Sequence, residues 1–373
     1  MWKEVKGQYK AIQTLKKIYE NKRLANAYIF YGPDGIGKDA AAIEFAKLIN
    51  CENPVNGNEA CGACRSCRQT AQLASGFFKF ITALPTGKSD KPDTNPLAGL
   101  SQEDYDTYLE EINLKIRDSY HTINIPKANN IRIDSIKQIK HDIYLTPDKG
   151  RKKVFLISRA DMMNIQSANS LLKILEEPPG DSVLILTTSK INSLPPTIIG
   201  RCQKIIFDYL SDDDIKSYIK ELKPGIDDNE LNYFAYLSEG SISKCRNVLD
   251  ENFLEMRDLC VELLRSVAAN RKMKLINDIK QFSKDKEKIK KVIFIFMIWF
   301  RDSVYIDNGL PEKMLNSDKS DTIKKFNDNY KINFYKVQAL LENALKDLEG
   351  NLNSDILLEK LFFDMGRYIK RIL

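Results

Sequence analysis

The chain has 373 residues, which predicts two or three domains on a prior of roughly 100–200 residues each. Apolar residues make up 43% and charged residues 29%, a balance typical of a globular chain and unlike that of a disordered one. Its 57 basic and 51 acidic residues nearly cancel to a net charge of +6, so the charge permits contact with nucleic acid but does not require it.

We expect neither a secretion signal nor a membrane-spanning helix. The N-terminal segment MWKEVKGQYK lacks the apolar stretch of a signal peptide. The longest apolar run is Val292–Phe300, whereas crossing a bilayer takes about 20 such residues. These features predict a cytoplasmic protein with no membrane partner. In that reducing compartment, the seven cysteines favour metal ligands or free thiols over disulfides.

Strands and helices are predicted to alternate through the first part of the chain. Strands separated by helices imply a parallel sheet that is covered on both faces, an α/β domain at 1–208. A polar segment at about 83–120 interrupts it and reads as a surface insertion. In chain order, the predicted elements are a helix around Ile12–Ile18, a strand at Ala27–Tyr31, a helix at Ala40–Ile49, a helix at Glu103–Ile116, a strand at His121–Ile125, a helix at Ile133–Ile143, a strand at Lys153–Ile157, a helix at Ile165–Leu175, and strands at Val183–Leu186 and Ile205–Phe207.

After Leu210 the pattern predicts helices only. Ser211–Asp214 resembles a capping box that begins a helix. We predict a small helical domain at 209–252 and a larger one at 253–373. The run Val292–Phe300 is apolar on every side, which indicates a helix that is buried all round.

Gly32–Lys38, with the sequence GPDGIGK, matches the phosphate-loop pattern G-x-x-x-x-G-K. Gly32, Gly35 and Gly37 would let backbone N–H groups face phosphate oxygens, and Lys38 would reach the β and γ phosphates. A strand before the loop and a helix after it are the context that this motif needs. We therefore interpret it as a nucleotide-binding loop, with an ordinary glycine-rich turn as the alternative.

Asp39 departs from the motif, which has Ser or Thr at this position to bind Mg²⁺ through a hydroxyl. A carboxylate there is a negative charge close to the phosphates. At an effective dielectric near 20, a unit charge about 4 Å away contributes roughly 4 kcal/mol, which Lys38 would offset only in part. We expect the binding of ATP and Mg²⁺ to be weakened or abolished. A second GKS sequence, Gly87–Ser89, lacks the earlier glycine and is interpreted as a chance match.

ATPases of this kind also need an acidic residue at the end of a later strand to hold Mg²⁺. The candidate strand, Val154–Ile157, is followed by Ser158 and Arg159 instead. Asp161 comes three residues later, and we predict that it caps a helix. Two catalytic features are therefore missing together.

Four cysteines in one short segment have the spacing C-x9-C-x2-C-x2-C. Four soft ligands at this spacing suit a tetrahedral zinc ion with no open coordination position, so we expect a structural site at 51–67. A redox pair and an iron–sulfur cluster are the alternatives. The ligands would be Cys51, Cys61, Cys64 and Cys67. The isolated thiols are predicted to lie in the core, at Cys202, Cys245 and Cys260.

Taken together, the sequence resembles the AAA+ clamp-loader family over roughly residues 1–250. The stretches that carry the resemblance are the loop GPDGIGKD, the four-cysteine insertion directly after its helix, the run Ser167–Pro178 (SANSLLKILEEP), and Gly200-Arg201-Cys202. The resemblance implies an AAA+ P-loop domain at 1–208, a helical lid at 209–252, and a helical collar at 253–373 that holds the subunits in a ring.

The resemblance also implies roles for single residues. In this family a Ser-Arg-Cys motif supplies an arginine finger to ATP bound by a neighbouring subunit, and Arg201 matches it although Gly200 replaces the serine. The alternative for Arg201 is an ordinary surface salt bridge. Thr187 and Thr188 match the sensor-1 region, and Ser243 stands where active members have the sensor-2 arginine.

These features predict a subunit that does not hydrolyse ATP alone. It would act as a rigid stator, supply Arg201 in trans, and help to place a sliding clamp on primed DNA. Its partners would be gamma/tau-type and delta-type subunits in a hetero-pentamer. One alternative is an ATP-hydrolysing gamma/tau-type subunit, against which Asp39, Ser158 and Ser243 argue. The other is a zinc-dependent nucleic-acid-binding protein.

Overall fold

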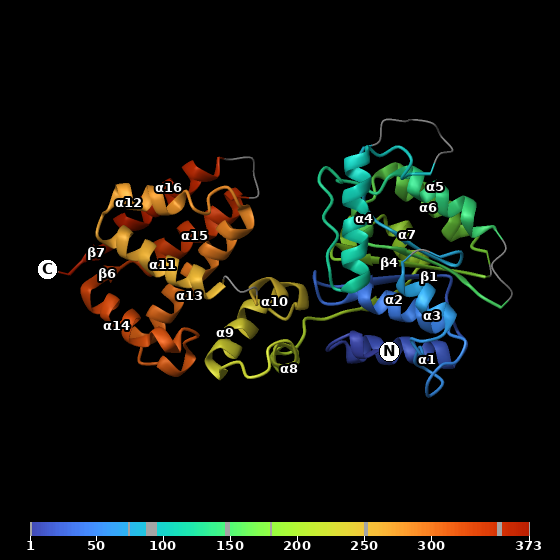
Figure 1. Ribbon diagram of the computed structural model, residues 1–373, viewed down its shortest axis with the longest axis horizontal. Helices are drawn as coiled ribbons and strands as arrows, with labels where there is room; N and C mark the ends of the chain where they lie inside the picture. Colours follow the sequence, from blue (N-terminus) through green and yellow to red (C-terminus); the bar gives the residue numbers. More distant parts are fainter. Residues whose placement is uncertain are drawn as a thin grey trace. The chain divides into compact units, whose positions relative to one another are not determined.

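The fold comes from a computed structural model that describes residues 2–73, 75–86, 95–145, 150–179, 181–249, 253–348 and 353–372. The chain divides into two units, and each is described by itself. Unit 1 comprises residues 1–222 and 235–247, and unit 2 comprises residues 223–234 and 248–373. Figure 1 shows a sheet with helices in unit 1 and helices in unit 2.

A parallel sheet of five strands organises unit 1 within the described residues, in the order β2-β3-β4-β1-β5. Tyr31 pairs with Thr188, and Ile157 pairs with Leu186. This register brings the carboxyl ends of β1, β3 and β4 to one edge of the sheet. The strands are β1 (Ala27–Tyr31), β2 (Phe78–Ile81), β3 (Lys153–Ile157), β4 (Ser182–Thr188) and β5 (Gln203–Ile206).

Helices cover both faces of this sheet, as the alternating sequence pattern predicts. On one face, Tyr28 and Phe30 of β1 pack against Phe45 of α2. In unit 1 the helices are α1 (Tyr9–Glu20), α2 (Lys38–Ile49), α3 (Arg65–Ala71), α4 (Gln102–Arg117), α5 (Ile133–Ile143), α6 (Ile165–Glu176), α7 (Pro196–Arg201), α8 (Asp212–Leu222) and α10 (Ile242–Val248).

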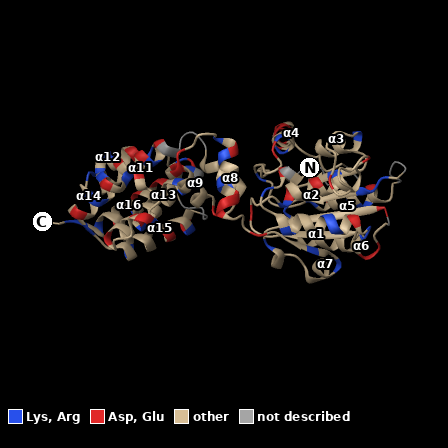
Figure 2. Cartoon of the chain, turned by 90° about the horizontal axis from the view of Figure 1, so that it is seen from below, with Lys and Arg blue, Asp and Glu red and all other residues tan. Residues whose placement is uncertain are grey.

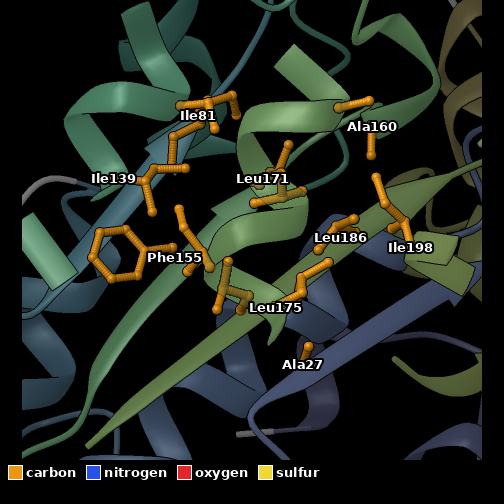
Figure 3. Close-up of a cluster of buried hydrophobic side chains, with 14 of the residues drawn as sticks. Ala27, Ile81, Ile139, Phe155, Ala160, Leu171, Leu175, Leu186 and Ile198 are labelled. Carbon is orange, nitrogen blue, oxygen red and sulfur yellow. The ribbon is translucent and has the colours of Figure 1, made fainter. Parts of the chain in front are cut away.

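The other face of the sheet holds a hydrophobic cluster with α5, α6 and α7. In Figure 3, side chains from the helices and the strands point toward one another in this cluster. Leu171 of α6 and Leu186 of β4 are fully buried, and burying such a side chain contributes about 1.5–3 kcal/mol. Strands β3 and β4 are buried along their whole length, as strands of a doubly covered parallel sheet must be.

Two sequence predictions fail in this unit. No strand forms at His121–Ile125, because the polar groups of this segment bind elsewhere: the carbonyl of His121 accepts a hydrogen bond from Lys115, and the N–H of Asn124 donates one to Glu111. Strand β2 was not predicted. It is short, and its sequence FKFI runs directly into the segment that was interpreted as the insertion.

Helix α13 lies among the helices of unit 2 and packs against α11, α14 and α15. Within it, Val292–Phe300 is almost wholly buried, which confirms the prediction of an enclosed helix. The elements are α11 (Phe253–Ala268), α12 (Lys272–Ile279), α13 (Lys286–Asp307), α14 (Ser320–Asn329), β6 (Tyr330–Ile332), α15 (Phe334–Leu348), α16 (Ser354–Arg367) and β7 (Ile369–Arg371), while α9 (Asp228–Ser238) crosses the division between the units.

Charges of both signs are spread over the helices of both units in the view of Figure 2. This agrees with the near balance of basic and acidic residues in the sequence. Among the helices in the part of the chain that the structure describes, none has the length and apolar character needed to cross a bilayer.

Candidate functional site

The phosphate loop connects β1 to α2, as its motif requires. Gly37 precedes the first turn of α2 with a φ of +100°, a left-handed conformation that favours glycine. The ammonium of Lys38 donates hydrogen bonds to the carbonyls of Gly32, at 2.8 Å, and Pro33. Burial lowers the pKa of Lys38 from its ordinary value of 10.5. The lysine is therefore turned onto the backbone of its own loop.

Asp39 lies in the first turn of α2, where the helix dipole favours a negative charge. Its carboxylate accepts hydrogen bonds from the hydroxyls of Ser158, at 2.8 Å, and Thr187, at 2.7 Å. It also lies 3.0 Å from the ammonium of Lys115. Burial alone would raise the pKa of Asp39, but Lys115 and the two hydroxyls hold it below its ordinary value of 3.8. An ionised side chain with partners on both oxygens thus takes the position of the metal-binding hydroxyl.

The neighbouring strand ends are also bonded among themselves. Thr188, like Thr187, is 1% exposed, and its hydroxyl donates to the carboxylate of Asp161 at 2.6 Å. The prediction that Asp161 caps a helix is therefore wrong. Asn164 caps α6 instead, because its side chain accepts the N–H of Ser167 at 2.8 Å.

A further wall of the site, which the sequence reasoning missed, is the segment that ends α4. We call residues 115–121 the crossing segment. Its Lys115 is 3% exposed, and the ammonium also donates to the carbonyl of His121 at 2.7 Å. The ring of Tyr120 lies so close to Gly37 that a Cβ at this glycine would be 2.9 Å from it.

The cavity beside the phosphate loop has a volume of about 60 Å³ and is lined by the loop, the strand ends and the crossing segment. Pockets that bury drug-sized ligands measure about 300–1,000 Å³. The cavity is therefore small beside a typical ligand pocket, and the crossing segment forms one of its walls. One sequence signal pointed to it: Lys115 follows Tyr108 and Ile112 at helical spacing, on the half-buried face of α4.

The region that matches sensor 2 contacts the phosphate loop from another direction. The backbone N–H of Ser243 donates to the carbonyl of Gly35 at 3.1 Å, and the hydroxyl of Ser241 donates to the carbonyl of Asp34 at 3.1 Å. The hydroxyl of Ser243 donates to the carbonyl of Tyr120 at 2.9 Å. Ser241 and Ser243 thus form hydrogen bonds to the phosphate loop and the crossing segment. They provide neither the positive charge of the sensor-2 arginine nor a ligand for phosphate.

Arg201 lies at the end of α7, away from the cavity that the chain's own phosphate loop lines. Its side chain is 39% exposed and donates to the carboxylate of Glu176 at 3.2 Å and the carbonyl of Thr197 at 3.1 Å. A Cβ at Gly200 would meet nothing within 4 Å. A serine side chain would therefore meet no steric clash at this position, so packing does not explain the glycine.

The four clustered cysteines lie together, with their sulfur atoms within 4.8 Å of one another. Sulfur ligands about 2.3 Å from a tetrahedral zinc ion are about 3.8 Å apart, so the set fits such an ion. Backbone N–H groups of Cys61 and Cys64 donate to the sulfurs of Cys51 and Cys61, both at 3.2 Å. N–H donors, that of Cys64 first, lower the pKa of Cys61 to about 6, whereas burial raises the pKa of Cys51 and that of Cys67.

The three isolated cysteines are buried, as predicted. Burial raises the pKa of Cys202 to about 12 and that of Cys245 to about 11, and Cys260 is likewise raised. Such thiols are protonated and serve as core side chains. The second GKS sequence, Gly87–Ser89, lies outside the described residues.

Comparison with known proteins finds one family over most of unit 1. Residues 7–211 match the family described as DNA polymerase III, delta subunit. The delta′ subunit of Bacillus subtilis is 28% identical over 376 residues, which cover 96% of this chain and 97% of the relative. The delta′ subunit of Pseudomonas aeruginosa is 32% identical over 178 residues, 48% of this chain and 42% of the relative.

A tau subunit is also similar, although over a smaller share of its length. The tau subunit of Bacillus subtilis is 27% identical over 255 residues, which cover 67% of this chain but only 37% of the relative. The parallel sheet with its phosphate loop and these likenesses define a clamp-loader type of protein. The chain belongs to the DNA polymerase III delta-subunit family, and its similarity to a delta′ subunit over nearly the whole of both chains makes it delta-prime-like.

Proposed function

We propose that this chain is a clamp-loader subunit that does not hydrolyse ATP. One observation carries the proposal: the carboxylate of Asp39 is bonded to Ser158, Thr187 and Lys115 within the site where a metal–nucleotide complex would have to bind. An active site needs an acidic residue where Ser158 stands, and it needs Lys38 free for phosphate. Here Lys38 bonds its own loop.

We further propose that Arg201 acts in trans as an arginine finger. Its guanidinium is partly exposed, is anchored by one carboxylate, and lies outside the lining of the chain's own cavity. A planar cation presented at the surface suits the γ-phosphate of ATP held by a neighbouring subunit, because it stabilises charge that develops during phosphoryl transfer. The partners that complete this site would be gamma/tau-type and delta-type subunits in a hetero-pentamer, acting with the sliding clamp and primed DNA.

The test is the DNA-stimulated ATPase of a reconstituted loader that carries Arg201→Ala. At the one ATP site that Arg201 would serve, the rate constant should fall by about 10³-fold or more, while the remaining sites keep their activity. The matched control is Arg23→Ala, because Arg23 is an exposed arginine of the same unit. Unchanged hydrolysis and clamp loading with Arg201→Ala would sink the arginine-finger role.

We also propose a structural zinc ion at Cys51, Cys61, Cys64 and Cys67. The spacing of the four sulfur atoms and the N–H groups aimed at them support it. With four protein ligands, the ion would keep no open position for a substrate. It would hold α3 and the loop before it against α2, which α3 contacts. Metal analysis of the purified chain, with Cys64→Ser as the comparison, tests this proposal.

The remaining domain assignments follow from the family. We propose that 1–208 is an AAA+ domain, that 209–252 serves as a lid, and that 253–373 serves as a collar for oligomerisation, in a protein that works in the cytoplasm. The enclosed helix α13 supports a mainly helical collar, but the antiparallel pair of β6 and β7 shows that the prediction of helices only after Leu210 is wrong. An ATP-hydrolysing gamma/tau-type role is the second candidate, because the tau relative matches 67% of the chain. ATP turnover by the isolated chain would favour it.

A further inference from the structure

The crossing segment contacts several parts of unit 1 that surround the phosphate loop. Lys115 pairs with Asp39 of the first turn of α2, and Tyr120 covers Gly37. The hydroxyl of Tyr120 accepts the backbone N–H of Lys6 at 2.8 Å. The segment therefore connects the N-terminal residues, the loop and α2.

The same segment is fixed to α10 on its other side. Asp118 forms an ion pair with Arg246 of α10, and the guanidinium of Arg246 lies over the ring of Tyr120, 5.6 Å from its centroid. Ser243, also in α10, donates its hydroxyl to the carbonyl of Tyr120 at 2.9 Å. Phosphate loop and α10 are thus linked through residues 115–121 as well as by their direct hydrogen bonds.

Charge explains why this arrangement is stable. An ionised carboxylate at Asp39 requires a compensating cation, because burial penalises its charged form. Lys115, itself 3% exposed, provides that cation within 3.0 Å. Removing one partner of such a buried pair leaves an uncompensated charge, whereas removing both is far less harmful.

We propose that the crossing segment is the resident occupant of this degenerate phosphate site. Lys115 neutralises Asp39, Tyr120 covers the loop, and the segment fastens the loop to α10 and to the N-terminal residues without any nucleotide. The site is thereby converted from a ligand-binding site into an internal clasp of unit 1. The inference rests on the proposed non-hydrolysing function, but it does not involve Arg201.

Hydrogen exchange on the full chain tests the clasp with the variant Lys115→Met. We expect the amides of Gly35–Asp39 and of Ser241–Arg246 to exchange about tenfold faster or more, although within the described residues Lys115 bonds to Asp39 and His121 and not to the second group. The amides of β3 should keep their rates. Lys137→Met is the matched control, because Lys137 is an exposed lysine of α5 and the charge change is the same. Equal exchange in the two variants would overturn the proposal.

A double-mutant cycle of Asp39 and Lys115 keeps the test informative if the single variant Lys115→Met is poorly folded. In urea unfolding, Asp39→Asn/Lys115→Met should have a midpoint closer to that of the parent chain than Lys115→Met alone has. Additive losses in the double variant would mean that the two residues do not act as a pair, which would refute the clasp.

The last part of the test measures hydrogen exchange in the presence of a nucleotide. Adding ATP with Mg²⁺ to the parent chain should leave the exchange of Gly35–Asp39 unchanged, because the crossing segment takes the space a nucleotide needs. Protection of these amides by ATP would overturn the proposal. All three arms use the isolated chain, so their failure is distinguishable from failure of Arg201→Ala, which is read only in the assembled loader.

Discussion

The bond between Arg201 and Glu176 allows a quantitative prediction for the variant Glu176→Gln. The two groups lie 3.2 Å apart, with side chains that are 39% and 52% exposed. Pairs this exposed contribute about 0–1 kcal/mol, so breaking this one can raise the population of free Arg201 by at most about fivefold. If Arg201 is drawn from Glu176 toward a neighbour's phosphate, Glu176→Gln should increase ATP hydrolysis by a factor within that limit.

The assay is the DNA-stimulated ATPase of the reconstituted loader, measured with and without Arg201→Ala. Glu176→Gln should act only when Arg201 is present. Glu177→Gln is the matched control, because Glu177 is an exposed neighbour that the structure does not place on Arg201. A decrease in rate with Glu176→Gln would show that Glu176 orients the finger rather than restrains it. The same effect in the Arg201→Ala background would refute the reasoning altogether.

Further predictions concern stability. Asp302 is fully buried and accepts the N–H groups of Leu315 and Asn316, so Asp302→Ala should lower the free energy of unfolding by about 3–5 kcal/mol in urea titrations, against less than about 1 kcal/mol for the exposed Asp307→Ala. The folded-state pKa of Asp39 lies below the ordinary 3.8, so its contribution is present above that value and is lost as pH falls through the lower one. The urea midpoints of the parent chain and of Asp39→Asn should therefore converge as the pH is lowered below about 4. Removal of the proposed zinc ion by a chelator should speed hydrogen exchange in α3 and leave β3 unaffected, whereas equally faster exchange in both would argue against a local zinc site.

Much of the fold was predictable because buried apolar residues recur in the sequence at the regular spacing of a helix or a strand. Ile136, Ile139 and Ile143 of α5 recur at helical spacing and are buried together, and β3 has the bounds Lys153–Ile157 that its apolar run predicts. The predictions of secondary structure failed in segments whose conformation depends on contacts with residues distant in the sequence. His121–Ile125 reads as a strand, but its polar groups are bound by Lys115 and Glu111 of α4. Strand β2 has only four residues and depends on its pairing with β3.

The sequence by itself determined that the phosphate loop departs from a working one. Asp39 places a carboxylate where the motif has a hydroxyl, and Ser158 places a hydroxyl where a working site has a carboxylate, so both departures can be read from the sequence. Only the tertiary structure decided what became of the site. The ammonium of Lys115 lies 76 positions along the chain from Asp39 and meets it only because α4 packs beside the sheet edge. Two charged residues so far apart in the sequence leave no local pattern. Only the folded structure therefore shows that Lys115 provides the positive charge beside Asp39.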